Sequence, residues 1–582
     1  MEKIKHIIHI IKEEGIKGIT TRLHNRFSNP EKKEYEKWIS ANTPTHKELK
    51  EQRNHKFQYT PKISIVVPLY NTPKKYLLEL IKFTQKQTYT NWELCLADGS
   101  TKPLDYLNKV ISKEPRIHYQ ILAENKGISG NTNEALKLVT GDYVALLDHD
   151  DLLPVNSLYE IVKVINENPE VEYIFTDEDK FTNIHKHTRY EPNFKPDYSY
   201  DTLTSYNYIC HFSIFKKELM DKLGGFREEF NGSQDYDLIL RAVEQAKHVI
   251  HIPAILYHWR VHPNSTAGNA ESKPYCYEAG KNAVQEHLKR KGYTNATAEY
   301  GVAIVRNKVV YQRKTDSKIQ VLLFLQDNRI DLKKLNQEIQ SVTYQNYEIL
   351  LFVTEEITQK EGYTELTQND KIKQAKTIKQ LNLIKEWNIA AQNTNAEQIV
   401  FAKDIQTIKH KDIFEQLLGY IQRGDVGVIS PRVIYQYTSQ QYNGTVYGID
   451  KEKIGYLDYI DVAGSFGYVT RGAVVENYSI IKSEFMMVNK KDLAEANYLD
   501  ENMDFADSMA NLSFALYMKG KLNVIHPQIE VEAPEIMQKT GENCFFKKWE
   551  KQLEKPDPNY NINLKFEKNH LFEVKTERVD KA

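Results

Sequence analysis

Three short runs in the first half of the chain have the apolar pattern of buried strands. They are residues 62–69 (KISIVVPL), 92–97 (WELCLA) and 143–147 (YVALL), in which most positions are apolar and several are β-branched. Continuous apolar runs are typical of strands covered on both faces, as in a mostly parallel sheet. We therefore predict these three strands at the centre of the first half.

Helical patterns separate these strands. Residues 74–86 and 131–138 carry apolar side chains at the spacing of one helix face. The alternation of strand and helix predicts a doubly wound α/β domain. Ligands of such domains bind beyond the carboxyl ends of the strands. Asp98 and Asp148 follow two of the predicted strands, so we expect them to converge on one site.

The second half of the chain repeats the first at a nearly constant offset. Five residues recur 255 positions later: Tyr89, Asn91, Glu93, Asn133 and Ala135 recur as Tyr344, Asn346, Glu348, Asn388 and Ala390. The strand pattern of residues 62–69 has a counterpart at residues 318–325 (KIQVLLFL), one position out of step. This offset indicates duplication of a whole domain, so we predict a second, degenerate α/β domain.

The acidic residues at the strand end are not repeated. At the same offset Asp148, Asp150 and Asp151 become Lys403, Ile405 and Gln406. A lysine repels a metal ion, and isoleucine has none of the oxygen ligands that hard cations take. We therefore predict that the second copy is catalytically silent and serves packing, acceptor binding or dimerisation.

A chain of 582 residues exceeds what one hydrophobic core usually supports, and we divide it into five segments. They are a helical leader (1–58), a catalytic α/β domain (59–270), a helical and extended connector (271–317), a degenerate α/β domain (318–540) and a charged amphipathic tail (541–582).

Composition excludes several classes of protein. With 78 Lys and Arg against 79 Asp and Glu, the net charge of −1 gives no global reason to bind nucleic acid. The four cysteines lack the spacing of a zinc site or a disulfide framework, which fits a reducing, cytoplasmic compartment. The sequence contains no run of 18 apolar residues, so we expect neither a membrane span nor secretion.

Both ends of the chain have amphipathic, basic patterns. The apolar side chains on one helical face are Ile4, Ile7, Ile8 and Ile11 in the leader and Phe545, Phe546, Trp549 and Leu553 in the tail. Such faces bind the headgroup region of a membrane, or they dock on the protein itself or on a second subunit. The alternatives are therefore a peripheral protein at the inner face of the cell membrane, internal packing, or a homodimer.

The acidic run 148–151 (DHDD) is the first candidate for chemistry. Hard ions such as Mg²⁺ or Mn²⁺ take oxygen ligands and often need only one or two carboxylates besides phosphate oxygens. In a reaction with a diphosphate leaving group, such an ion stabilises the negative charge that develops on the diphosphate. The alternative is that the run forms a turn or a helix cap. We interpret Asp151 in that way, as a cap for the helix that follows Pro154.

Further motifs surround this run. PLYN at 68–71, ADGS at 97–100, ENKGISGNTNEAL at 124–136 and TGDYVALLDHDDLL at 140–153 occur in this order, and GGFREEFNGSQDYDLILRA at 224–242 and YHWRVHPNSTA at 257–267 follow. The order resembles the family-two inverting glycosyltransferases, which have the GT-A fold, a Rossmann-like α/β fold with a mostly parallel sheet. The resemblance spans about residues 61–266.

The resemblance implies roles on the donor side. Asp98 would hold the nucleobase of a nucleotide-sugar donor, and Asp148 the ribose or the metal. Asp150 would be the principal ligand of Mg²⁺ or Mn²⁺. Lys126 and Asn131 would touch the nucleotide, and the alternative is that they are only turn residues.

The resemblance also implies roles on the acceptor side. Asp235 would be the general base that takes the proton of the acceptor hydroxyl, although Gln234 stands where the family usually has Glu. The alternative for Asp235 and Asp237 is a pair of acids near a helix amino terminus. Asp177, in the acidic run 176–179, would recognise the sugar or the acceptor.

The segment YHWRVHPNS contributes three more candidates. We assign His258 to the metal site and His262 to the metal, diphosphate or acceptor side, with a structural role as the alternative for each. Arg260 lies between them and would contact a phosphate, because a guanidinium offers a fork of donors to anions.

These expectations combine into one function. The chain is predicted to move a sugar, with rhamnose as the first guess, from a nucleotide-sugar donor to a growing, lipid-linked glycan of a bacterial cell wall or capsule. The alternatives are a non-catalytic glycan-binding or scaffold protein and a nucleotidyltransferase. The latter needs a basic, glycine-rich loop after the first strand, where this chain has PLYN.

Overall fold

A computed structural model describes residues 30–102, 104–182, 188–262, 274–303, 305–378, 383–450, 453–536, 544–568 and 570–579. Ile4, Ile7, Ile8 and Ile11, the predicted amphipathic face of the leader, lie outside these residues. Among the described residues, the helices α2 (Pro30–Asn42) and α3 (His46–Asn54) precede the first strand. None of the helices described has both the length and the apolar character that a membrane crossing requires.

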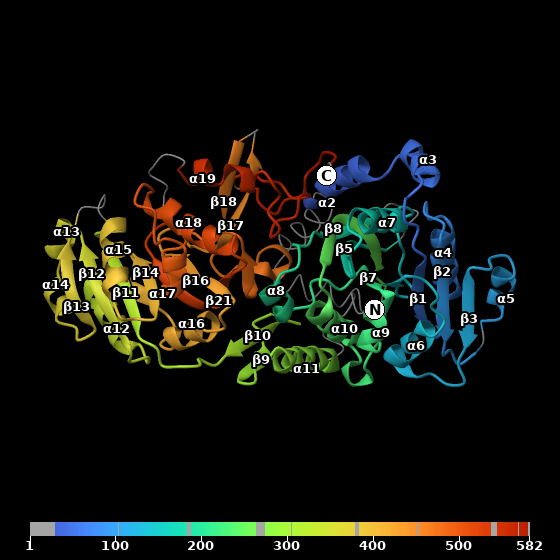
Figure 1. The fold of residues 1–582 in the computed structure, drawn as a ribbon, viewed down its shortest axis with the longest axis horizontal. Coiled ribbons are helices and arrows are strands. Elements are labelled where there is room, and N and C mark those ends of the chain that lie inside the picture. Colours follow the sequence, from blue (N-terminus) through green and yellow to red (C-terminus); the bar gives the residue numbers. More distant parts are fainter. Residues whose placement is uncertain are drawn as a thin grey trace, which may run out of the picture.

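The first sheet lies in the right-hand part of Figure 1 and contains all three predicted strands. Its members are β1 (Ile63–Leu69), β2 (Trp92–Asp98), β3 (Ile117–Ile121), β4 (Tyr143–Leu146), β5 (Tyr173–Phe181), β6 (Arg189–Asn193), β7 (Ser213–Lys216) and β8 (Val249–Arg260). The strand order is β3-β2-β1-β4-β7-β5-β6, with β8 paired to β5. Strands β1 to β4 are parallel, whereas β7 is antiparallel to both of its neighbours.

The segments between the strands form helices, because their apolar side chains recur at helical spacing. In α4 (Lys74–Gln85) the buried side chains are Leu77, Leu80, Ile81 and Thr84. The other helices of this half are α5 (Tyr106–Ile111), α6 (Gly127–Leu136), α7 (Ser157–Glu167), α8 (Tyr200–Ser205), α9 (Lys217–Leu223) and α10 (Gln234–Gln245). The connector then forms α11 (Pro274–Arg290) and the hairpin of β9 (Ala296–Tyr300) and β10 (Asn307–Tyr311).

The second sheet has the same strand order as the first. Its strands are β11 (Ile319–Leu325), β12 (Tyr347–Val353), β13 (Ile372–Thr377), β14 (Gln398–Lys403), β15 (Thr407–Ile408), β16 (Val426–Tyr435), β17 (Gln440–Asp450), β18 (Lys453–Val462), β19 (Glu476–Tyr478), β20 (Phe485–Asn489) and β21 (Leu522–Ala533). The order β13-β12-β11-β14-β20-β16-β17, with β21 paired to β16, matches the first sheet strand for strand. β18 extends the edge beyond β17.

The pairing registers repeat as well. Ile63 lies opposite Trp92 and Tyr143 in the first sheet. In the second sheet Ile319 lies opposite Tyr347 and Gln398. The offset is thus 255 for two strands and 256 for the central one, which is the one-residue shift seen in the sequence pattern. The predicted fold class, an α/β domain followed by a degenerate copy, is confirmed, although both sheets have antiparallel members.

Helices of the second half cover its sheet in the same way. They are α12 (Leu332–Ser341), α13 (Glu355–Thr358), α14 (Tyr363–Thr367), α15 (Leu383–Asn393), α16 (Ile413–Ile421), α17 (Lys490–Glu495), α18 (Phe505–Tyr517) and α19 (Cys544–Leu553).

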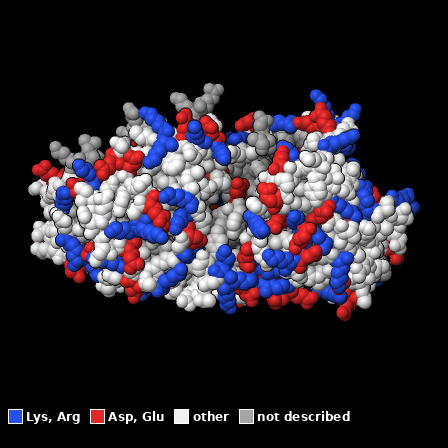
Figure 2. Space-filling view, in the orientation of Figure 1, with Lys and Arg blue, Asp and Glu red and all other residues white. Residues whose placement is uncertain are grey.

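Figure 2 shows basic and acidic side chains interspersed on the visible face, without a large field of one sign.

The tail packs on the protein itself, which is one of the alternatives predicted for it. The apolar face of α19 is covered, because Phe545 and Leu553 are buried in a cluster with Phe514. Beyond α19 the chain returns to the first half beside α2 (Figure 1), where Trp38 Nε1 donates to Asn563 Oδ1 at 3.1 Å. The idea that the apolar face of the tail lies on a membrane is therefore corrected.

Candidate active site

Asp148 is the most accessible carboxylate of the acidic run. It lies in the loop after β4, where the N–H of Leu147 still donates to Val66 of β1. Half of the Asp148 side chain is exposed (50%), against 16% for Asp150. A carboxylate in this place is available to a ligand at the carboxyl ends of the parallel strands.

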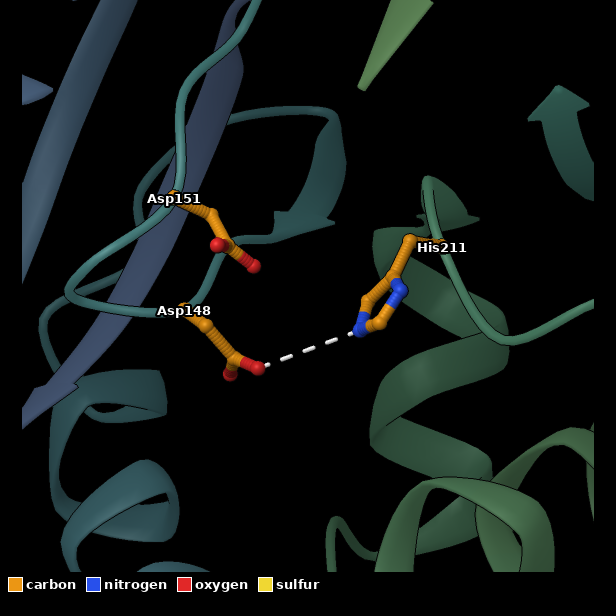
Figure 3. A group of neighbouring side chains, drawn as sticks. All are labelled: Asp148, Asp151 and His211. Atoms are coloured by element: carbon orange, nitrogen blue, oxygen red, sulfur yellow. Dashed lines mark ion pairs between the residues drawn. The ribbon is translucent and has the colours of Figure 1, made fainter. Parts of the chain in front are cut away.

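His211 faces Asp148 from the loop that leads into β7 (Figure 3). Its Nε2 lies 3.8 Å from Asp148 Oδ2, and its Nδ1 lies 3.3 Å from Glu178 Oε2. The ring stacks on Tyr257 with 4.5 Å between the centroids. Sequence reasoning missed His211, because it belongs to no motif that we recognised and lies far along the chain from the acidic run.

Asp150 is held between two histidines. Its Oδ2 lies 2.8 Å from His262 Nε2, and its Oδ1 lies 3.4 Å from His149 Nδ1. Burial acts to raise the pKa of Asp150, but the interactions with His149 and His262 outweigh it and lower the pKa to about 2. Asp150 is therefore ionised at neutral pH, as a ligand of a divalent cation has to be.

Asp151 is not the helix cap that we predicted. It is 1% exposed, and its two oxygens accept hydrogen bonds from Tyr257 Oη (2.5 Å) and the N–H of Arg260 (2.6 Å). The residue at the amino-terminal cap of α7 is Asn156. Asp151 thus joins the acidic loop to β8, a contact that spans over 100 residues of chain and has no local sequence pattern.

Arg260 supports the same loop and is not placed to contact a phosphate. It is 3% exposed, its Nε donates to the carbonyl oxygen of Asp150, and its Nη2 donates to Glu79 Oε2 at 3.0 Å. The guanidinium also lies over the ring of Tyr76. The prediction of a phosphate contact is therefore corrected, because Arg260 is buried and its Nε and Nη2 donate inside the protein.

His258 is turned away from the acidic loop. Its Nδ1 lies 2.6 Å from Asp179 Oδ1, and Asp179 also accepts hydrogen bonds from Arg189 and Tyr35. The assignment of His258 to the metal is corrected, because neighbouring residues of a strand point to opposite faces and Tyr257 faces the site instead.

One group of side chains in the described part of the chain is arranged to share a cation. The ligand atoms of Asp148, Asp151 and His211 all lie within 4.8 Å of one another. Both oxygens of Asp151 already accept hydrogen bonds. The side chains that remain as metal ligands are therefore Asp148 and His211. Asp150 and His262 form a second, adjacent pair of donors. Carboxylate oxygens and imidazole nitrogens are ligands that Mn²⁺ accepts.

Asp235 lies in the first turn of α10 and belongs to the same site. Its Oδ2 accepts hydrogen bonds from Asn207 Nδ2 (2.8 Å) and Cys210 Sγ (3.6 Å). Cys210 Sγ also lies 3.6 Å from His211 Nε2, which faces Asp148. Within the described residues no hydrogen bond is made to Asp235 Oδ1.

The neighbours of Asp235 have structural roles. Asp237 is fully buried and paired with Arg227 and Arg241, so its carboxylate is not available to an acceptor. Gln234 accepts the N–H of Gly232 at 2.8 Å and closes the turn before α10. Of the two aspartates of this motif, only Asp235 has a carboxylate oxygen that reaches the site.

The predicted nucleotide side is only partly as expected. Asp98 ends β2, is buried, and accepts hydrogen bonds from Tyr119 Oη (2.6 Å) and the N–H of Ser100 (2.9 Å). Asn131 is buried and binds the backbone of Leu69 and Lys126, which fits its turn role.

Lys126 and Asp177 are both engaged elsewhere. The ammonium of Lys126 pairs with Glu134 of α6 at 2.5 Å rather than pointing beyond the strand ends. Asp177 is buried between the first sheet and the tail, where it contacts His251 Nε2 (2.9 Å) and Asn561 Nδ2 (3.0 Å). The assignment of Asp177 to sugar or acceptor recognition is therefore corrected.

The fold and the site define an α/β protein that gathers carboxylates beyond the carboxyl ends of its parallel strands. Residues 64–224 match the sequence profile of Glycosyl transferase family 2, so the chain contains a domain of that family. The match covers β1 to β7 and ends before Asp235 and β8.

The chain is similar to curated proteins along most of its length. It is 29% identical to Uncharacterized protein y4gI of Sinorhizobium fredii over 88% of this chain and 59% of that protein. It is 27% identical to O-antigen biosynthesis protein RfbC of Myxococcus xanthus over 72% of this chain and 33% of that protein. The chain thus spans about a third to three fifths of the length of these relatives. Among solved structures, S. aureus TarS aligns over 39% of this chain and 40% of its own at 20% identity, with a TM-score of 0.33.

Proposed function

We propose that this chain transfers a sugar from a nucleotide-sugar donor to a growing bacterial surface polysaccharide, with inversion at the anomeric carbon. The observation that carries the proposal is the link between Asp148 and Asp235. They come from a strand end and a helix start 87 positions apart, yet His211 and Cys210 connect them within one site. A donor on one side and an acceptor on the other would meet between them.

The donor side consists of Asp98, Asp148 and Asp150. Asp98 would accept a hydrogen bond from the nucleobase, with Tyr119 holding its carboxylate in place. Asp148 and Asp150 would hold Mg²⁺ or Mn²⁺ together with the diphosphate oxygens. When bound, the ion supplies charge stabilisation for the leaving diphosphate. His262 replaces His258 in this proposal, because His262 is the histidine in contact with Asp150.

Asp235 is the proposed general base. A base has to lie within hydrogen-bond reach of the acceptor hydroxyl whose proton it removes. Asn207 orients Asp235 through Oδ2, which leaves Oδ1 for the hydroxyl. Direct attack of that hydroxyl on the anomeric carbon, on the face opposite the diphosphate, inverts the configuration.

The substrates are proposed from similarity and chemistry. The name of one relative, an O-antigen biosynthesis protein, supports a polysaccharide product. We propose rhamnose as the first donor sugar to test and a lipid-linked glycan as the acceptor. Contact with the inner face of the cell membrane would depend on the leader, since the apolar face of α19 is covered by protein.

The test is a screen of UDP-, dTDP- and GDP-sugars for hydrolysis or transfer in the presence of Mn²⁺ or Mg²⁺. Wild type is expected to turn over at least one donor, and EDTA and Asp150→Ala are each expected to abolish the reaction. Lys403→Ala changes the equivalent strand end of the second copy and serves as the matched control. Activity that persists in Asp150→Ala would remove the metal assignment, and a scaffold protein would show no turnover in any arm.

A further inference from the structure

We propose that the second, silent copy positions the loop that carries His211 and Cys210, and that Arg423 and Asn477 are its positioning residues. This proposal rests on the proposed function for its kinetic consequence. Residues 206–212, here called the site loop, join α8 to β7. The silent copy would thus act on catalysis without touching substrate.

The site loop connects three parts of the candidate site. Asn207 holds Asp235, Cys210 lies between Asp235 and His211, and His211 faces Asp148. Residues 206–212 themselves belong to no strand or helix, so the geometry of the site loop depends on contacts with the elements around it. A shift of this loop would move the proposed base relative to the donor site.

The first anchor lies directly before the site loop, in α8. Asp201 is 1% exposed and receives both terminal nitrogens of Arg423, which follows α16 of the second copy. Asn477 of β19 accepts the N–H of Asp201 at 2.9 Å and donates to its Oδ2 at 2.8 Å. Ser205, the last residue of α8, donates to the carbonyl of Val475 at 3.4 Å.

The second anchor holds the site loop from the other side. Lys195 is buried, and its ammonium donates to the carbonyl oxygens of Ile209 (2.6 Å) and His211 within the loop. The backbone carbonyl of Lys195 in turn accepts Asn561 Nδ2 of the tail at 2.9 Å. Both anchors therefore end on residues from beyond the first domain.

The charge of the first anchor makes it specific. A buried carboxylate without its partner is strongly unfavourable, so Asp201 is held where Arg423 places it. The pairing joins Asp201 to a residue 222 positions later in the chain. A silent copy that served only as packing material would not need paired charges and amides at this one helix.

The test compares Arg423→Met and Asn477→Ser with Lys482→Met, a control that removes a buried cation from an ion pair inside the second copy. Two quantities are measured: steady-state kinetics with the donor found in the nucleotide-sugar screen, and hydrogen–deuterium exchange of peptides covering residues 199–212. Arg423→Met is expected to lower kcat by about 10- to 100-fold, because small misplacements of reacting groups cost rates of this size. The donor KM should stay within about twofold, because Asp98, Asp148 and Asp150, the residues proposed to hold the donor, lie outside the site loop.

Exchange in residues 199–212 should become faster in Arg423→Met and Asn477→Ser and stay unchanged in Lys482→Met. Unchanged exchange in the first two variants, or an equal loss of kcat in the control, would overturn the proposal. Asn477→Ser keeps the Arg423–Asp201 pair and so gives a folded variant if Arg423→Met does not fold. If wild type turned over no nucleotide sugar, the proposed function would fail, while the exchange comparison would still decide whether the second copy holds the loop.

Discussion

The two halves of this chain have the same strand order and opposite chemistry at the equivalent strand end. After β4 the chain continues with Asp148, and after β14 the residue at the same offset is Lys403. The strand registers place Glu484, before β20, at the position of His211, before β7. An accessible acid opposite a histidine in one copy thus corresponds to a lysine and a glutamate in the other.

The acid that follows Lys403 in the second copy, Asp404, forms its contacts within that copy. Asp404 Oδ1 accepts the N–H groups of Gln326 (2.7 Å) and Asp327 (3.0 Å) just beyond β11, and its Oδ2 pairs with Lys403 at 2.9 Å. In the first copy the residue after β1, Tyr70, is 44% exposed. The comparison teaches that the same fold can fill the space beyond the strand ends with its own side chains, as Asp404 does in the second copy, or leave it accessible, as at Asp148 in the first.

The largest expected effect is a loss of catalytic rate when Asp235, the proposed general base of the first copy, is replaced. Asp235→Asn should lower kcat about 10²- to 10⁴-fold, the usual contribution of general base catalysis, while donor binding is retained. Steady-state kinetics and calorimetric titration of the donor measure the two quantities. Asp237→Asn should instead lower thermal stability, since it removes the buried negative charge that Arg227 and Arg241 share. Loss of donor binding in Asp235→Asn would show that this residue is not the base.

A smaller effect is expected where the first copy has a histidine beside its acid. His262→Ala should weaken the apparent affinity for Mn²⁺ by about 10- to 100-fold, a loss typical for groups that hold or orient a metal ligand. His258→Ala is the matched control and should leave Mn²⁺ affinity unchanged, because its ring is paired with Asp179. Electron paramagnetic resonance of free Mn²⁺ measures the affinity. Equal losses in both variants would contradict the replacement of His258 by His262.

The pH dependence of stability should differ between the copies, because each has a buried histidine on its last long strand. For His251 of β8, burial lowers the pKa but Asp177 and Asp197 outweigh it and raise the pKa to about 9. The folded state therefore keeps this proton, and the stability it adds is complete below the unfolded pKa of about 6.5 and is lost as pH rises to about 9.

For His526 of β21 the sign is reversed, since burial and then the charge of Lys308 lower the pKa to about 3. The folded state excludes this proton, so stability is lost as pH falls from about 6.5 towards 3, with a limiting slope of about 1.4 kcal/mol per pH unit. Urea unfolding at several pH values measures both effects. His251→Gln should reduce only the fall in the free energy of unfolding at alkaline pH, and His526→Gln only the fall at acidic pH. The opposite result, or an effect of either variant on both sides, would contradict the comparison.

The smallest effect is expected at the second strand end. Lys403→Met removes an ion pair that is largely buried, but Asp404 keeps its two backbone N–H donors, so the free energy of unfolding should fall by only about 1–2 kcal/mol, with transfer unchanged. Chemical denaturation and the donor assay test the two statements. A large loss of transfer would mean that the second copy has a site of its own.

Much of the fold could be predicted because its signals are local. Continuous apolar runs marked β1, β2 and β4, and the repeat at 255 residues marked their counterparts in the second sheet. Strand ends follow directly from strands, so Asp98, Asp148 and Asp150 could be chosen from the sequence. The segment boundaries and the roles of these residues remain predictions.

The site assignments that the structure corrected share one physical cause. Contacts between residues far apart in the sequence leave no local sequence pattern. Arg260, His258 and Asp177 carry suitable chemistry, but partners on other elements already use it. The pairing on β8 turns Tyr257 to the site and His258 away from it, and a sequence shows this alternation only when the register is known.

The sequence by itself determined the two-copy α/β architecture and the loss of acids in the second copy, since both depend on residue type at fixed spacing. Only the tertiary structure decided which polar groups meet. It brought His211, Cys210 and Asp235 to the accessible Asp148, and it joined Asp201 to Arg423 across 222 residues. Hydrogen bonds and ion pairs act over a few ångströms in space, whatever the distance along the chain.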